Sequence, residues 1–185
     1  MGKPLDQILV VDLEATCWEG DPPPDQEREI IEIGLCLLDV STGTRDERIS
    51  IVVRPERSTV SAYCTQLTTV TQEEADAGIT FDEACRLLRD TYRSRERVWA
   101  SFGDYDRQQF ERQCRSQQVI YPFGPRHINV RTLASLTHRL PEEVELPQAL
   151  ALTGLPMEGH HHRGVDDAWN IAALLAETLW PGRSH

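Results

Sequence analysis

The stretch Ile8–Glu14 places two acidic residues at the end of an unbroken apolar run. Residues 8–11 are all apolar and mostly β-branched, so they predict a buried strand. Asp12 and Glu14 are two positions apart, and such side chains point to the same face of a strand. They could simply form the solvated face of that strand, but a buried carboxylate needs a partner or a metal ion. The pattern therefore favours one half of a metal site.

A second pair of acidic residues follows another apolar stretch. Residues 97–102 predict a strand that ends at Gly103, and a helix begins at Asp104 or Tyr105. Asp104 fits the N-cap position of this helix, where a carboxylate accepts backbone N–H groups. Asp106 then lies in the first turn, where its carboxylate can face the edge of the sheet. We therefore assign a metal-ligand role to Asp106, with Asp104 as the alternative.

The third acidic cluster lies near the end of the chain, where His162 precedes Asp167 by five positions. A helix predicted over residues 165–179 has Asp166 and Asp167 in its first turn. Asp166 fits an acid that is stabilised by the helix dipole. Asp167 lies on the apolar side of the helix and can face the sheet. Together the three clusters suggest phosphodiester hydrolysis by two metal ions.

Two other chemistries fit the sequence less well. His160, His161 and His162 resemble a zinc ligand set, but consecutive residues do not converge easily on one ion, and no other His or Cys is spaced to help. Cys17 lies near the acidic pair, but no His stands in a nucleophile pattern with it. The five cysteines are scattered, without a CxxC pair, and this predicts reduced thiols.

Length and charge bound the remaining possibilities. The chain has 185 residues, which predicts one domain over 1–185 with a core of about 6–180. Its net charge of −11 argues against a broad electropositive surface for long nucleic acid and favours short or single-stranded ends. No apolar run approaches the roughly 20 residues that span a bilayer, and residues 1–7 lack the apolar stretch of a signal peptide. We expect a soluble, cytoplasmic protein without a membrane partner.

The order of predicted elements indicates an α/β fold. Residues 8–13, 30–39 and 47–54 predict three antiparallel strands, joined at the second connection by a turn at 41–44. Further strands are predicted at 97–102 and 127–130. Helical patterns separate and follow them, at residues 71–74, 81–88, 104–117, 132–139, 147–153 and 165–179. This order predicts a mixed five-stranded sheet flanked by helices.

Three motifs then resemble one known family. Val11–Cys17 (VDLEATC), Ser101–Phe110 (SFGDYDRQQF) and His162–Ala172 (HRGVDDAWNIA) are similar to the motifs of 3′→5′ exonucleases of the DEDD superfamily, in the subgroup that contains His. The resemblance spans nearly the whole chain and implies an RNase H-like fold. Arg28–Gly34 and Cys64–Thr68 further resemble the Eri-type branch, which trims the 3′ ends of structured and small RNAs.

The chain departs from this branch in two ways. Thr69 and Val70 stand where the branch has Gly-Ile, and this bears on the local turn and the shape of the nucleotide pocket. The sequence also shows no appended nucleic-acid-binding domain, so the stem-loop recognition of larger relatives is not implied.

The resemblance implies roles for five residues. Asp12, Glu14, Asp106 and Asp167 would hold two Mg²⁺ or Mn²⁺ ions, for which oxygen ligands are suited. His162 would take the proton of the attacking water, because its ordinary pKa of about 6.5 lies near working pH. The substrate would be the single-stranded 3′ end of RNA or DNA, and the product a nucleoside 5′-monophosphate.

Five further residues are weaker candidates for holding the terminal nucleotide. They are Leu13 and Ala15 on the first strand, Leu67 and Thr68 on a facing loop, and Tyr105, which could stack on a base. Ordinary core packing is the equal alternative for Leu67. The leading hypothesis is an exoribonuclease. An exonuclease for DNA or short oligonucleotides, and a non-catalytic regulatory nucleic-acid-binding module, remain as alternatives. Protein partners are unknown.

Overall fold

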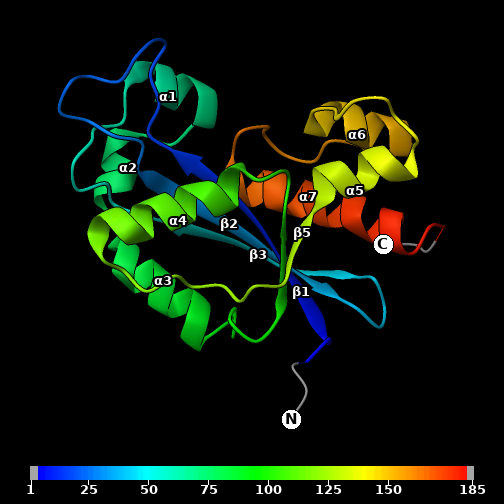
Figure 1. The fold of residues 1–185 in the computed structure, drawn as a ribbon. Helices are drawn as coiled ribbons and strands as arrows, with labels where there is room; N and C mark the ends of the chain where they lie inside the picture. Colours follow the sequence, from blue (N-terminus) through cyan, green and yellow to red (C-terminus); the bar gives the residue numbers. More distant parts are fainter. Residues whose placement is uncertain (1–3, 183–185) are drawn as a thin grey trace.

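The structure, a computed structural model, describes residues 4–182 and consists of one sheet with helices around it (Figure 1). The elements alternate after an opening of three strands. In chain order they are β1 Gln7–Ala15, β2 Ile30–Asp39, β3 Arg45–Val52, α1 Ala62–Thr68, α2 Gln72–Asp76, α3 Phe81–Asp90, β4 Val98–Ser101, α4 Tyr105–Gln117, β5 His127–Asn129, α5 Val130–Thr137, α6 Leu146–Thr153 and α7 Gly164–Leu179.

The five strands form one mixed sheet in the order β3-β2-β1-β4-β5. β1, β2 and β3 pair antiparallel, which confirms the predicted opening. β4 and β5 then continue the sheet parallel to β1, with Ile8 opposite Val98 and Trp99 opposite His127. Because β1 and β4 run in the same direction, their carboxyl ends lie at one edge of the sheet. That edge is where ligands bind in open sheets of this kind.

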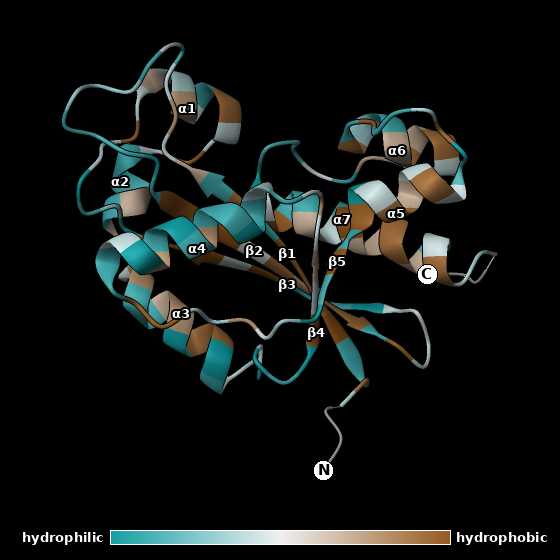
Figure 2. Cartoon of the chain, viewed as in Figure 1, coloured by the Kyte–Doolittle hydropathy of each residue, from teal (hydrophilic) through white to brown (hydrophobic). Residues whose placement is uncertain are grey.

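β1 is buried on both faces, because helices cover the sheet from both sides. Its side chains alternate between two cores. Leu9, Val11 and Leu13 pack in the cluster that contains residues of α3 and α4. Ile8 and Val10 pack on the opposite face, in the cluster that contains residues of α5, α6 and α7. The apolar colouring of the strands continues onto the inner sides of these helices (Figure 2).

The ends of the helices follow the capping chemistry of the sequence. Thr71 accepts the backbone N–H of Glu74 at 3.1 Å, as its spacing predicted. Thr80 and Glu83 form a capping box at the start of α3. The sequence prediction missed α1, a helix of 7 residues whose N-cap is Ser61 and which buries only Cys64 and Thr68. It contains Leu67 and Thr68, which were expected on a loop.

Other boundaries shift by a few residues. β3 begins at Arg45 and ends at Val52, rather than spanning 47–54. α5 begins at Val130, two residues early, because the Asn129 side chain caps it by accepting the N–H of Thr132. All five cysteines are free, as predicted. Within residues 4–182, no helix combines the length and the apolar character needed to cross a membrane.

Candidate active site

Two carboxylates on β1, those of Asp12 and Glu14, face the helix layer that contains α7. Ile8 and Val10 face the core that contains α7, and the alternation of a strand sends the even-numbered Asp12 and Glu14 to the same side. Glu14 is 9% exposed and its neighbour Leu13 only 4%. The two acids therefore point between layers of the protein, rather than along a solvated strand face.

The third carboxylate, that of Asp167, comes from α7. Its start packs against β2 so closely that a Cβ on Gly34 would lie 1.9 Å from the carbonyl oxygen of Gly164. This approach brings Asp167, in the first turn of α7 and 3% exposed, to the two acids of β1. One carboxylate oxygen from each of Asp12, Glu14 and Asp167 can be chosen so that all three lie within 4.8 Å of one another.

Asp106 joins the cluster from α4. It lies in the first turn of this helix, is 3% exposed, and its Oδ1 accepts the backbone N–H of Leu13 at 3.1 Å. Asp104 occupies the N-cap position, but its side chain makes no capping bond and pairs with Arg107 at 3.1 Å. The structure therefore places Asp106 with the other acids and leaves the alternative, Asp104, at the surface.

Burial and crowding alter the ionisation of these groups. Burial, reinforced by the charge of Asp106, raises the pKa of Asp12 well above its ordinary value. Burial and the nearby Asp167 raise the pKa of Glu14 to about 9. Burial also raises the pKa of Asp106 to about 7, against the opposing effect of the Leu13 N–H. Without a cation, the cluster holds protons that ordinary carboxylates release.

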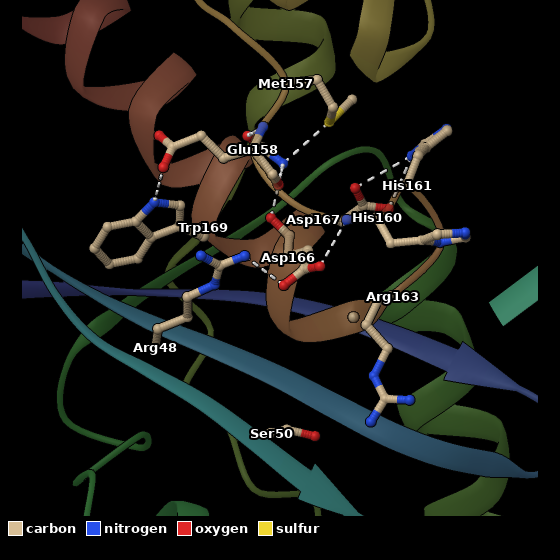
Figure 3. Close-up of polar contacts among 12 residues, drawn as sticks. Arg48, Ser50, Met157, Glu158, His160, His161, Arg163, Asp166, Asp167 and Trp169 are labelled. Atoms are coloured by element: carbon tan, nitrogen blue, oxygen red, sulfur yellow. Dashed lines mark hydrogen bonds and ion pairs between the residues drawn. The ribbon is translucent and has the colours of Figure 1, made fainter. Parts of the chain in front are cut away.

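His162 lies beside this cluster in a left-handed backbone conformation, with φ of 67°. Its backbone N–H donates to Asp167 Oδ2 at 2.8 Å. Burial lowers the pKa of His162, and the neighbouring His161 lowers it further. The ring that contacts the Asp167 carboxylate is that of His161, with Nδ1 3.0 Å from Oδ2 (Figure 3). The sequence prediction gave His161 no role beyond the rejected zinc set.

A pocket of about 280 Å³ contains these groups. Its lining includes seven residues predicted from the sequence: Asp12, Leu13, Glu14, Tyr105, Asp106, His162 and Asp167. Three predicted substrate contacts lie outside this lining. Ala15 is buried at the end of β1, and Leu67 lines a separate hollow beside α1. Thr68 is buried, and its hydroxyl donates to the carbonyl oxygen of Cys64 at 2.9 Å.

The lining also includes residues that the sequence prediction missed, namely Phe102, Arg131, Glu145, Leu146 and His161. Arg131 donates from Nε to the carbonyl oxygen of Val144 at 3.0 Å and pairs with Glu145 at 2.6 Å. Both charged residues come from the segment between β5 and α6. No spacing in the sequence connects this segment with the acidic motifs.

Glu32 is a second omission, and it supports the site from β2. Its carboxylate is completely buried and accepts the N–H of Gly164 at 2.9 Å, the Nε of Arg163 at 3.1 Å and the hydroxyl of Ser50 at 2.5 Å. Arg163 also pairs with Glu74 of α2. These contacts fix the start of α7. The sequence did contain one indication of this role, because Glu32 interrupts the otherwise apolar segment Ile30–Leu35.

The donor set fits a divalent cation. Three carboxylates whose oxygens approach within 4.8 Å repel one another when ionised. Burial, with this repulsion added, raises the pKa values of Asp12 and Glu14. A hard cation such as Mg²⁺ or Mn²⁺ prefers oxygen ligands and would offset the repulsion. The residues that are present therefore suit the metal ions that the sequence predicted.

Comparison with known proteins agrees with this geometry. The model of the exonuclease (RNase_T) family matches residues 9–175. Human 3′-5′ exoribonuclease 1 is 32% identical over 187 residues, which cover 96% of this chain and 53% of the human protein. The Drosophila melanogaster 3′-5′ exonuclease Snipper is 28% identical over 205 residues, covering 97% of this chain and 72% of that protein.

A solved structure extends the comparison to the fold. The nuclease domain of 3′hExo, a DEDDh family member bound to rAMP, gives a TM-score of 0.85 at 28% identity, covering 99% of this chain and 96% of that one. The sheet and its helices thus form the RNase H-like fold of DEDDh nucleases. The chain belongs to the exonuclease (RNase_T) family. It spans about half the length of the human relative, 53%.

Proposed function

We propose that this chain is a metal-dependent 3′→5′ exoribonuclease that releases nucleoside 5′-monophosphates from single-stranded 3′ ends. The observation that carries the proposal is the convergence of Asp12, Glu14 and Asp167 within 4.8 Å, with Asp106 and His162 lining the same pocket. The names of the human and Drosophila relatives support the reaction, and that of the human relative supports RNA as substrate.

We assign the metal site to Asp12, Glu14, Asp106 and Asp167. When bound there, two Mg²⁺ or Mn²⁺ ions would lower the pKa of a water molecule and stabilise charge on the leaving 3′ oxygen. The N–H of Leu13 holds the Asp106 carboxylate in place. The N–H of His162 does the same for Asp167. These bonds keep Asp106 and Asp167 in position before substrate arrives.

His162 accepts the proton of the attacking water in this proposal. Burial lowers its pKa, so its imidazole is neutral at neutral pH and has a free nitrogen to receive a proton. Tyr105, at the first position of α4, lines the pocket and is 43% exposed as a residue. Such a ring can stack on any base, which suits removal of nucleotides without sequence reading.

Two alternatives remain from the sequence. An exonuclease for DNA or short oligonucleotides uses the same chemistry with a different sugar. A regulatory binding module would keep the pocket and bind oligonucleotide without releasing product. The presence of all four acids and of His162 in one pocket favours an active enzyme over the module.

The test is a time course on single-stranded RNA and DNA of the same sequence, with Mg²⁺, Mn²⁺ or EDTA. Asp106→Asn should lower the rate of mononucleotide release more than about a hundredfold, because metal-ion catalysis is worth several kcal/mol. Asp104→Asn, two positions away and outside the pocket, is the matched control and should retain the rate. Thermal melting of both variants checks that they are folded.

Each outcome has a definite meaning. Metal-dependent release that is faster on RNA supports the exoribonuclease. Faster release on DNA favours the alternative substrate. Oligonucleotide binding without any product, by a folded and metal-loaded protein, would contradict the proposed enzyme and favour the regulatory module.

A further inference from the structure

The histidines at 160–162 have different surroundings in the structure. The rings of His161 and His162 stack with centroids 3.9 Å apart. His161 Nδ1 lies 3.0 and 3.2 Å from the two carboxylate oxygens of Asp167. His160 is exposed, and its backbone N–H donates to Asp166 at 2.7 Å (Figure 3). The imidazole of His161 therefore contacts the buried Asp167 carboxylate, and the imidazole of His162 is stacked against that of His161.

These groups have the spacing of a metal site. His161, His162 and Asp167 each offer one ligand atom, and these atoms lie within 4.8 Å of one another. Tetrahedral zinc with bonds of about 2.0–2.1 Å has ligand atoms roughly 3.4 Å apart. Small rotations of the two partly exposed rings would provide that distance. Three protein ligands with a fourth position left for water are an ordinary zinc arrangement.

The donor set discriminates between metals. The first candidate ligand set, Asp12, Glu14 and Asp167, offers only oxygen ligands, which suit Mg²⁺ and Mn²⁺. The second set, His161, His162 and Asp167, offers two imidazole nitrogens. It suits Zn²⁺ or Co²⁺, which bind nitrogen ligands more strongly than Mn²⁺ does. Asp167 belongs to both sets. An ion bound at the two histidines therefore competes with the other site for the carboxylate of Asp167.

We propose that His161, His162 and Asp167 form a zinc site whose occupation excludes metal from the carboxylate site and inhibits the protein. Zinc there takes up the imidazole of His162 as well as Asp167. The inhibition rests on the proposed nuclease function, whereas zinc binding and the exclusion of the second metal do not. The site lies in the open pocket, so zinc can reach it from solution.

Metal binding by itself tests the site. We would titrate the apo protein with Co²⁺, following the visible absorption of the ion, and then displace it with Zn²⁺. His161→Ala should weaken zinc binding at least tenfold, since loss of even an indirect contact to a metal ligand costs about 10–100-fold. His160→Ala is the matched control from the same run and should change the affinity less than about twofold. Unchanged binding in His161→Ala, or equal weakening in both variants, would overturn the site.

Exclusion is measured with protein loaded with Mn²⁺, whose free ion gives a paramagnetic resonance signal. Zinc should release Mn²⁺ from wild type, and about tenfold more zinc should be needed with His161→Ala. Retention of all Mn²⁺ at saturating zinc would contradict the proposed exclusion. In the nuclease assay, the zinc concentration that halves Mg²⁺-dependent release should rise similarly in His161→Ala. Failure of the proposed function appears separately, as no release before zinc is added.

Discussion

Gly34 of β2 and Gly164 of α7 meet backbone to backbone, and the space between them does not hold a methyl group. A Cβ at position 34 would lie 1.9 Å from the Gly164 carbonyl oxygen and 2.4 Å from the backbone nitrogen of Val165. This contact sets the depth at which α7 packs on the sheet. The position of Asp167 follows from it, because this residue lies in the first turn of the same helix.

Gly34→Ala should therefore displace the start of α7 and destabilise the fold. Overpacking of this kind costs about 1–3 kcal/mol, and each kcal/mol corresponds to roughly 2–4 °C in the melting temperature at this chain length. Gly20→Ala is the control, because nothing lies within 4 Å of its added Cβ. Thermal melting of the two variants gives the comparison. Equal melting temperatures would mean that the backbone contact is not needed.

The second prediction concerns pH and the metal-free protein. In the unfolded chain, carboxyl groups ionise near pH 4. In the folded chain, burial raises the pKa of Asp106 to about 7 and that of Glu14 to about 9. Between about pH 4 and pH 9 the folded state therefore binds more protons than the unfolded state. The stability that comes from these groups is therefore complete below about pH 4 and is lost as the pH rises toward 9.

Melting in EDTA should show this loss as a melting temperature that falls from pH 5 to pH 9. Mn²⁺ should reduce the fall, because a cation at the cluster replaces the protons that it holds. Asp106→Asn should also reduce it, since the amide does not ionise. A fall of the same size in Asp106→Asn, with and without Mn²⁺, would assign the pH dependence to other groups.

Arg131 gives a third prediction, on substrate affinity. Its guanidinium lines the acidic pocket and lies over Phe102 at 5.9 Å from the ring centre. A positive group at this position can pair with a backbone phosphate of the oligonucleotide. Arg131→Gln should raise KM about tenfold with a smaller effect on kcat. It should also reduce the slope of log KM against log salt by about 0.7, the value for one phosphate of a single strand.

Arg107→Gln is the matched control for this experiment. Arg107 is partly exposed on α4, pairs with Asp104 and Glu111, and is outside the pocket lining. It should leave both KM and the salt slope close to the wild-type values. If the two arginine variants behave alike, the effect comes from the general charge of the protein and not from the pocket.

Thr69 gives a fourth prediction, on stability. It follows α1 with φ of 65°, in the left-handed region that β-branched side chains avoid. Thr69→Gly should relieve a strain of about 1–2 kcal/mol, partly offset by the larger entropy of glycine in the unfolded chain. The expected net result is a melting temperature about 2 °C higher. Gln118→Gly, at a left-handed position without a β-branch, should gain less. A lower melting temperature for Thr69→Gly would show that its side chain stabilises the turn.

Much of the site could be predicted from the sequence because its acids belong to short local patterns. Asp12 and Glu14 end an apolar strand, and Asp167 lies on the inner side of an amphipathic helix start. Each pattern already contains the direction of its side chain. Asp106 was separable from Asp104 for the same reason, since only the residue inside the first turn faces the sheet edge.

The rest of the site depends on contacts between distant segments. Arg131 and Glu145 reach the pocket because α5 and α6 pack beside α7, and neither residue lies in a pattern of its own. Glu32 is explained by Gly164, which lies 132 positions farther along the chain. Leu67 and Thr68 were expected on a loop because α1 has only 7 residues, which is too short for a clear hydrophobic periodicity.

The hydrogen bond from Leu13 to Asp106 joins residues 93 positions apart, and Asp167 enters still later in the chain. A chain that emerges from the ribosome therefore carries Asp12 and Glu14 long before it carries their partners. Until α7 has left the ribosome and docked on β2, these two acids have no complete metal site. The order of synthesis thus withholds the proposed hydrolytic chemistry until α7 has been made and has packed on the sheet.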